Sequence, residues 1–120
     1  MAKITITRRD LDIINGLVYN AVNLMIINIK DAKEIAANMT PTMNKGSRDI
    51  IFRRATKLLE GELVKFTISV ESALSLINIV KDKEPHLIER IKEGLIKNVA
   101  YRAEKYEESQ EALRNLIESL

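Results

Sequence analysis

Residues 38–47 read NMTPTMNKGS and residues 81–85 read KDKEP, and these two stretches contain both prolines of the chain. Proline interrupts a helix because it lacks the amide hydrogen and clashes with the preceding turn. The Asn, Thr, Gly and Ser residues around Pro41 are also typical of turns. We therefore expect the chain to change direction at these two places.

Three segments of similar length lie around the two breaks, and each has the apolar spacing of a helix. Apolar residues recur at intervals of three and four within residues 7–39, 47–81 and 85–119. This period is that of an amphipathic helix. Helices of that length would each be about 50 Å long. Short connections favour antiparallel neighbours, so the sequence predicts one all-α domain over residues 1–120, an elongated antiparallel bundle of three long helices completed by oligomerisation.

Local signals support the starts of the first two helices. Thr7 followed by Asp10 resembles a capping box, and Ser47 is a favourable N-cap. Residues 66–72, FTISVES, instead alternate like a strand and are rich in β-branched side chains. We assign them to the second helix because a single strand would have no partner.

The composition excludes several chemistries. The 120 residues include 19 Lys and Arg, 17 Asp and Glu, no Cys and one His, with 46% apolar and 4% aromatic residues. Without Cys there are no disulfides, thiolate zinc sites or cysteine nucleophiles. A single histidine, His86, leaves little for a His-based catalytic centre. We expect a protein that is not an enzyme and needs no cofactor and no metal.

No segment predicts a membrane protein. The N-terminal sequence lacks the long apolar core of a signal peptide. The longest apolar stretch, residues 21–29, is interrupted by Asn23 and Asn28 and is too short to span a bilayer. The expected location is the cytoplasm.

Apolar residues exceed what one bundle needs on its inner faces. Residues 11–29 are apolar over more than half of the helix circumference, whereas a bundle helix needs a narrower stripe. The second helix carries another apolar line, opposite its main stripe, formed by Ile50, Val64, Ile68 and Ile79. One interpretation is scattered exposed apolar residues, which are common. The other is self-association, most simply as a twofold dimer.

Three polar residues fall where the pattern predicts apolar ones: Asn28, Glu62 and Arg102. Counting outward from the turns places Glu62 level with Arg102 and near Asn28. We therefore expect a Glu62–Arg102 ion pair with an Asn neighbour in or beside the core. Such a layer either fixes helix register or lines a ligand pocket.

A basic cluster surrounds the start of the second helix. Between residues 45 and 57, five cationic side chains accompany a single carboxylate, that of Asp49. Backbone amides at a helix N-terminus favour anions, so the sequence predicts a candidate phosphate or nucleic-acid site formed by Lys45, Gly46, Ser47, Arg48, Arg53, Arg54 and Lys57. The alternative is that glutamates at the end of the third helix neutralise the cluster.

Those glutamates, Glu104, Glu107, Glu108 and Glu111, have a spacing that would place most of them on one helix face, where they could bind Mg²⁺. The E-E-x-x-E string at residues 107–111 resembles half of the motif of the MazG-type all-α nucleotide pyrophosphohydrolases. The resemblance covers five residues, and the second acidic pair of those enzymes has no counterpart in the nine residues that follow. A solvated acidic face is the simpler interpretation.

The leading hypothesis is a non-enzymatic, homo-oligomeric protein-interaction module, an adaptor or inhibitor. Its small size and its abundance of Ile, Asn and Lys, which have AT-rich codons, are consistent with a phage or mobile element. The alternative is a binder of nucleic acid or a nucleotide through residues 45–57. The weaker alternative, which the MazG-type resemblance implies, is a Mg²⁺-dependent nucleotide hydrolase.

Overall fold

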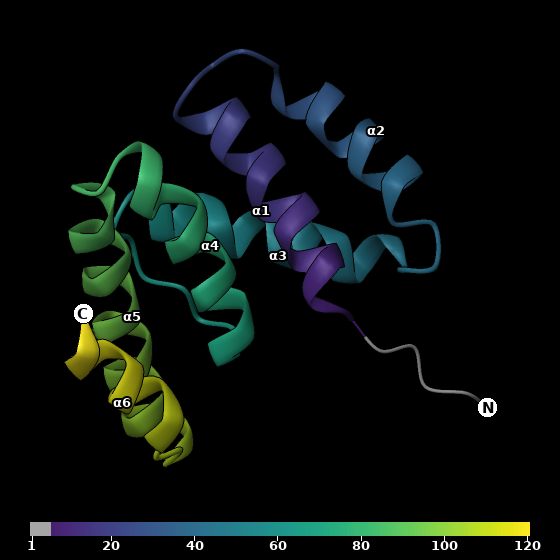
Figure 1. Ribbon diagram of the computed structural model, residues 1–120. Coiled ribbons are helices and arrows are strands. Elements are labelled where there is room, and N and C mark those ends of the chain that lie inside the picture. Colours follow the sequence, from purple (N-terminus) through teal and green to yellow (C-terminus); the bar gives the residue numbers. More distant parts are fainter. Residues whose placement is uncertain (1–5) are drawn as a thin grey trace.

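The computed structural model describes residues 6–120 and contains six α-helices in that range: α1 (Arg8–Val22), α2 (Ile29–Met39), α3 (Lys45–Leu59), α4 (Val70–Lys83), α5 (Leu87–Tyr106) and α6 (Glu111–Ser119) (Figure 1). Within this range there is no strand. The all-α class is therefore confirmed, but the bundle of three long helices is wrong. The molecule measures 41 × 36 × 20 Å, shorter than a single helix over residues 7–39 would require.

The first expected helix divides at residues 23–28. Asn28 is the N-cap of α2, and its side-chain oxygen accepts a hydrogen bond of 2.8 Å from the amide of Asp31. An asparagine side chain competes with helical hydrogen bonding in this way, which favours a new helix start over continuation. Met25 adopts a positive φ of 55° between the two helices. The chain therefore turns here although the apolar period continues.

The second and third expected helices divide where the backbone becomes left-handed. Gly61, with φ of 71°, follows α3, and residues 62–69 run without helical structure to α4. Glu107 and Gln110, with φ of 56° and 45°, separate α5 from α6. Glycine adopts such a φ readily, whereas for glutamate and glutamine it is uncommon.

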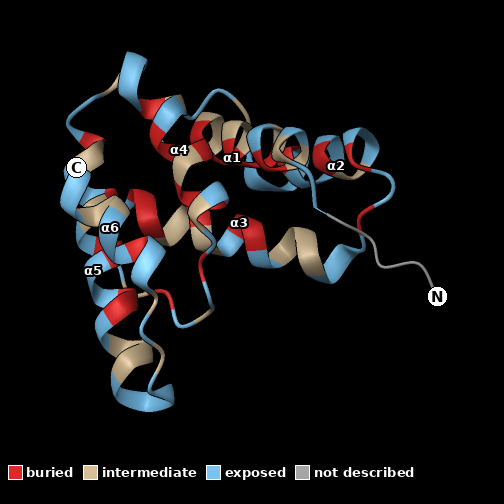
Figure 2. Cartoon of the chain, turned by 60° about the horizontal axis from the view of Figure 1, so that its bottom comes forward, coloured by how far each residue is buried: buried red, intermediate tan, exposed pale blue. Residues whose placement is uncertain are grey.

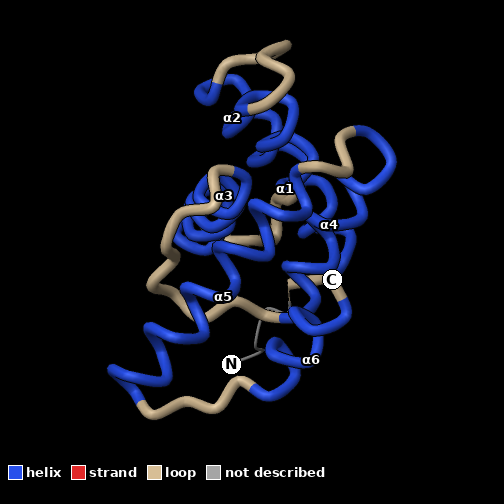
Figure 3. The backbone as a smooth tube through the Cα atoms, turned by 90° about the vertical axis from the view of Figure 1, so that its left-hand side faces the viewer, coloured by secondary structure: helices blue, strands red, loops and turns tan. Residues whose placement is uncertain are grey.

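Side chains take the place of a strand partner along residues 62–69. Figure 3 shows this non-helical segment crossing α5. Side chains of neighbouring helices donate hydrogen bonds of 2.7–2.9 Å to its backbone carbonyls: Asn98 to Val64 and Phe66, Arg102 to Lys65, and Arg54 to Thr67. Most of the FTISVES segment is therefore not helical, and helix α4 includes only its last residues. The expectation that an unpaired strand-like segment must become helical was wrong because side chains satisfy its backbone.

The helices pack around α1. It contacts α2, α3 and α4, while α3, α4 and α6 contact α5. Helices α1 and α4 run parallel, since Arg8 pairs with Glu71 at one end and Tyr19 with Glu84 at the other. Buried residues gather where α1, α3 and α4 meet (Figure 2). Figure 1 shows α2 on one side of this centre and α5 and α6 on the other.

Much of the core and one helix start agree with the sequence pattern. Buried residues include Leu11, Ile14, Val18, Ile51, Ala55, Leu58, Ile91 and Leu95. The capping box of Thr7 and Asp10 is present. Ser47 is not an N-cap, because Asn44 caps α3 and accepts the amide hydrogen of Ser47 at 2.8 Å. Within residues 6–120, no helix has the length and apolar character needed to cross a membrane.

Candidate functional site

The predicted basic cluster at residues 45–57 is divided by internal contacts. Arg48 donates hydrogen bonds to the carbonyls of Thr40 and Met43, at 2.9 and 3.0 Å, and so binds the chain that follows α2. Arg54 donates to Thr67 and, at 3.5 Å, to the Ser72 hydroxyl. Burial lowers the pKa of Arg54. Both arginines therefore hold the fold together.

The remaining members of the cluster are more accessible. Gly46 lies exposed in the first turn of α3. Lys45 pairs with Asp49 at 3.7 Å, and Lys57 lies 4.0 Å from Glu62. Arg53 is exposed and its guanidinium lies 5.7 Å from the ring centre of Phe66. The ion pairs described for residues 6–120 join none of these cations to the C-terminal glutamates.

The predicted polar layer does not form. Glu62 is exposed, and Asn28 is exposed at the start of α2. Arg102 instead makes a two-pronged ion pair with Glu108, with N–O distances of 2.6 and 2.7 Å. The Glu62–Arg102 pair assumed continuous helices, and the turns at Gly61 and Glu107 change which side chains meet.

The buried polar residues are different ones. Asn15 donates to the Ser75 hydroxyl at 3.0 Å, and Ser75 donates to Asp12 at 2.6 Å. Asn98 is fully buried against residues 62–69. Both asparagines interrupt an apolar stripe in the sequence, as Asn28 does. The same pattern that singled out Asn28 could therefore have identified Asn15 and Asn98 as buried polar residues. These polar groups join α1 to α4 and α5 to the segment 62–69.

The predicted oligomer face is not a continuous free surface. Val64 and Ile68 are buried in the core of the chain, Ile79 is half-buried, and Ile50 is exposed. The line opposite the main stripe presumed that residues 61–69 were helical. Because these residues are not helical, Val64 and Ile68 lie in the core, and that part of the prediction is wrong.

A different apolar surface is exposed at the turn between α1 and α2. We define the apolar turn as Leu24, Met25, Ile26 and Ile29, all of which are exposed. Met25 is 80% exposed and Ile26 68%, more than any other large apolar side chain in residues 6–120. No charged residue occurs between Asp12 and Lys30. The turn therefore presents a neutral, apolar surface to solvent.

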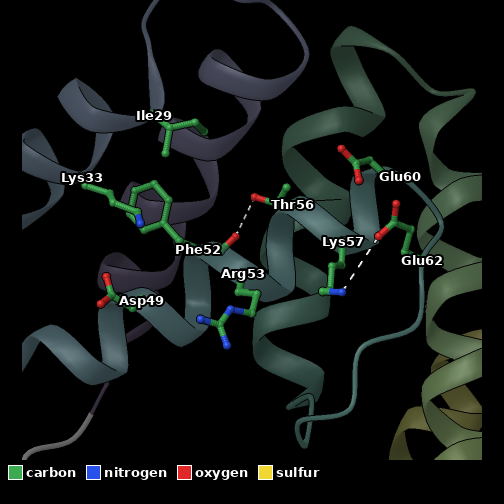
Figure 4. Close-up of a pocket in the computed structure, with 9 residues that line it drawn as sticks. All are labelled: Ile29, Lys33, Asp49, Phe52, Arg53, Thr56, Lys57, Glu60 and Glu62. Carbon is green, nitrogen blue, oxygen red and sulfur yellow. Dashed lines mark hydrogen bonds and ion pairs between the residues drawn. The ribbon is translucent and has the colours of Figure 1, made fainter.

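A groove of mixed charge lies beside this turn. The hollow, with a cavity volume of about 420 Å³, is lined from α2 by Ile29 and Lys33, from α3 by Asp49, Phe52, Arg53, Thr56 and Lys57, and by Glu60 and Glu62 just after α3 (Figure 4). Lys33 lies 6.0 Å from the ring centre of Phe52. A second hollow of about 220 Å³ shares Lys33, Asp49 and Phe52 with the first. Together they form one groove between α2 and α3.

The glutamates of the weaker Mg²⁺ alternative, Glu104, Glu107, Glu108 and Glu111, do not share one helix face. Helix α5 ends at Tyr106, Glu107 has a left-handed backbone, and Glu108 binds Arg102. In residues 6–120 no group of three or more His, Cys, Asp or Glu side chains is arranged to hold a metal ion. His86 is exposed and lies 3.5 Å from Glu84.

Neither a protein-family model, nor a curated protein, nor a solved structure matches this chain.

Proposed function

We propose that the chain is a non-enzymatic protein-binding module that associates with a second copy of itself through the apolar turn. The observation that carries this proposal is the exposure of Met25 and Ile26. Exposure of large aliphatic side chains to water raises the free energy, and burying them lowers it by about 25 cal/mol per Å² of apolar surface. Met25 also has a positive φ, which is uncommon for residues other than glycine and is often found at functional sites.

A second copy suits the turn because of its neutrality. In a twofold dimer the same surface meets itself, so like charges would face one another if the surface were charged. The stretch from Ile13 to Ile29 has no charge, and a side-chain amide of asparagine has both donor and acceptor atoms with which to meet its counterpart. Association of two such turns therefore meets no like-charge repulsion at its centre.

The α2–α3 groove is also suited to its own copy. Three cations, Lys33, Arg53 and Lys57, and three carboxylates, Asp49, Glu60 and Glu62, line the larger hollow. A twofold-related copy can present its carboxylates to the cations of the first, and the reverse. Charge complementarity of this kind selects the partner and its orientation more than it adds affinity.

Sedimentation equilibrium at micromolar concentration tests the proposal. The wild-type protein is expected at twice the 13.7 kDa mass of one chain. A double variant, Met25→Asn with Ile26→Asp, is expected to be monomeric with an unchanged circular-dichroism spectrum. Asparagine accepts a positive φ, so the first substitution keeps the turn. Ile96→Asp is the matched control, because Ile96 is exposed on α5 outside the turn. This variant should remain dimeric.

Two results would overturn the proposal: a wild-type protein that stays monomeric throughout, or a dimer that survives the double variant. A mixing experiment tests the groove separately. Lys33→Glu with Arg53→Glu in one protein, and Asp49→Lys with Glu60→Lys in another, should each weaken self-association. Their mixture should restore dimers, because opposite charges then meet. Loss of dimerisation that mixing does not restore would rule out pairing across the groove.

A further inference from the structure

The end of α5 brings aromatic rings and cations together on a surface distant in sequence from the basic cluster. Tyr101 and Tyr106 lie edge to face, with ring centres 6.4 Å apart. Lys65 and Lys105 approach the ring of Tyr101 to 5.9 and 6.0 Å, and Arg102 approaches Tyr106 to 4.5 Å. We call Lys65, Tyr101, Arg102, Lys105 and Tyr106 the basic–aromatic face.

The ring of Tyr106 is supported in place. Arg102, which lies against it, is itself held by two hydrogen bonds to Glu108 and by one of 2.7 Å to the carbonyl of Lys65. A guanidinium over an aromatic ring is attracted by the electrons of the ring face. Tyr106 nevertheless remains 53% exposed. It is therefore an aromatic platform backed by a fixed cation and open to solvent.

Free positive charge lies beside this platform. Lys65 and Lys105 are exposed, and within residues 6–120 neither forms an ion pair. The charge of Glu108 is offset by Arg102, which lowers the pKa of Glu108 through their hydrogen bonds. A hollow of about 300 Å³, lined by Tyr101, Glu104 and Lys105, lies beside the ring of Tyr101. That volume is at the lower end of small-ligand sites.

We propose that the basic–aromatic face binds single-stranded nucleic acid. Unpaired bases stack on exposed aromatic rings, and lysines beside the rings contact the phosphates between successive bases. Here Tyr106 receives one base, the hollow beside Tyr101 receives the next, and Lys65 and Lys105 contact the backbone. In a duplex the bases stack on one another and cannot stack on the tyrosines, so only the contacts between lysines and phosphates remain.

This site is independent of the apolar turn and of the α2–α3 groove, since it shares no residue with either. It also differs from the site predicted at residues 45–57. That cluster has no aromatic ring among its cations in the sequence apart from buried Phe52. Folding brings two neighbouring tyrosine rings and three cations together where residue 65 meets residues 101–106.

Fluorescence anisotropy with labelled oligonucleotides tests the proposal. Single-stranded RNA and single-stranded DNA of the same mixed sequence should both bind at low salt, and the matching duplex should bind several-fold more weakly. Comparison of the two affinities shows whether the site prefers RNA or DNA. Tyr106→Ala should weaken binding about tenfold, whereas Tyr106→Phe, which keeps the stacking ring, should bind nearly as the wild type does.

Charge variants separate this site from general attraction. Lys65→Glu with Lys105→Glu should abolish binding and reduce the dependence of affinity on salt. Lys30→Glu with Lys81→Glu makes the same change of charge at exposed positions elsewhere and should have a small effect. Absence of binding at low salt, equal effects of the two charge reversals, or unchanged affinity of Tyr106→Ala would overturn the proposal. Displacement of the oligonucleotide by polyglutamate as readily as by unlabelled strand would also overturn it, in favour of an acidic protein.

Discussion

The side-chain amide of Asn98 donates a hydrogen bond of 2.7 Å to the backbone carbonyl of Val64, and the same nitrogen donates one of 2.8 Å to Phe66. Asn98 lies on α5, whereas Val64 lies in the segment 62–69 that connects α3 to α4. The Asn98 oxygen accepts a hydrogen bond from Gln110 in the turn before α6. One buried side chain therefore fastens two non-helical parts of the chain to one helix.

Asn98→Ala should lower the free energy of unfolding by about 2–4 kcal/mol, because it leaves buried carbonyls without donors. Urea denaturation followed by circular dichroism measures the change. Asn78→Ala is the control: Asn78 is exposed on α4, and its loss should change stability by about 0.5 kcal/mol or less. Equal effects of the two substitutions would contradict a special role for Asn98.

Gly94→Ala should destabilise the protein. A Cβ atom at Gly94 would lie 2.8 Å from the Leu58 Cδ2 and 3.2 Å from the Glu62 carbonyl, where α3 crosses α5. Relief of this overlap should cost about 1–3 kcal/mol. Gly16→Ala is the matched substitution, since nothing lies within 4 Å of the added atom. In the middle of α1 it should stabilise by up to about 1 kcal/mol. Thermal melts of both variants provide the test, and opposite shifts are expected.

Tyr19 should make stability fall at alkaline pH. Burial, together with the hydrogen bond of 2.6 Å and the charge of Glu84, raises the pKa of Tyr19 to about 12 from 10.0. Between these values the unfolded chain releases the phenol proton while the folded chain keeps it. The stabilisation is therefore complete below pH 10 and is lost as the pH rises through 12.

Tyr19→Phe isolates this effect. At neutral pH it should cost about 1–2 kcal/mol for the lost hydrogen bond. Its stability should approach that of the wild type as the pH rises from 10 to 12. Urea denaturation at several pH values measures the difference, and absorbance of the tyrosinate ion reports the titration directly. A constant difference across this range would show that Tyr19 titrates normally.

The Arg102–Glu108 pair should protect the turn between α5 and α6 in a pH-dependent way. The hydrogen bonds from Arg102 lower the pKa of Glu108 below 4.5. The pair therefore contributes stability above the ordinary glutamate pKa, and this contribution is lost as the pH falls through the lowered value. Amide hydrogen exchange at residues 107–110 should accelerate at acid pH beyond the intrinsic change in exchange rate. Glu108→Gln should show fast exchange at neutral as well as acid pH. Unaltered protection of residues 107–110 in this variant would contradict a protective role for the Arg102–Glu108 pair.

The helical class and much of the core follow from local pattern. Ile14, Val18 and Leu95 lie on the apolar stripes that recur at intervals of three and four, and all three are buried, because an apolar residue on a helix stripe leaves water by packing against another element. Thr7 and Asp10 could be recognised as a cap because both partners lie within one turn. The interruption at Asn28 had a local cause too, but the unbroken apolar period concealed it.

The candidate sites were less predictable. The Glu62–Arg102 pair was inferred by counting residues along continuous helices. Each unrecognised turn changes which residues of neighbouring helices lie at the same level, so the expected partners do not meet. The basic residues at 45–57 were correctly seen as a cluster in sequence. Their partners were not visible, because Arg48 and Arg54 bind backbone carbonyls that any residue supplies. The apolar turn was hidden within a segment that the pattern assigned to a helix.

By itself, the sequence determined that this protein is helical, which apolar residues form much of its core, and that it lacks cysteine and has one histidine. Tertiary structure alone decided that residues 62–69 are not helical, that Met25 and Ile26 face solvent, and that Lys65 meets Tyr101. The physical reason is range. Helical periodicity and capping depend on residues within about one turn. The path of residues 62–69 and the contact of Lys65 with Tyr101 depend on side chains that folding brings from distant parts of the chain, and the exposure of Met25 and Ile26 depends on which distant parts pack against the turn.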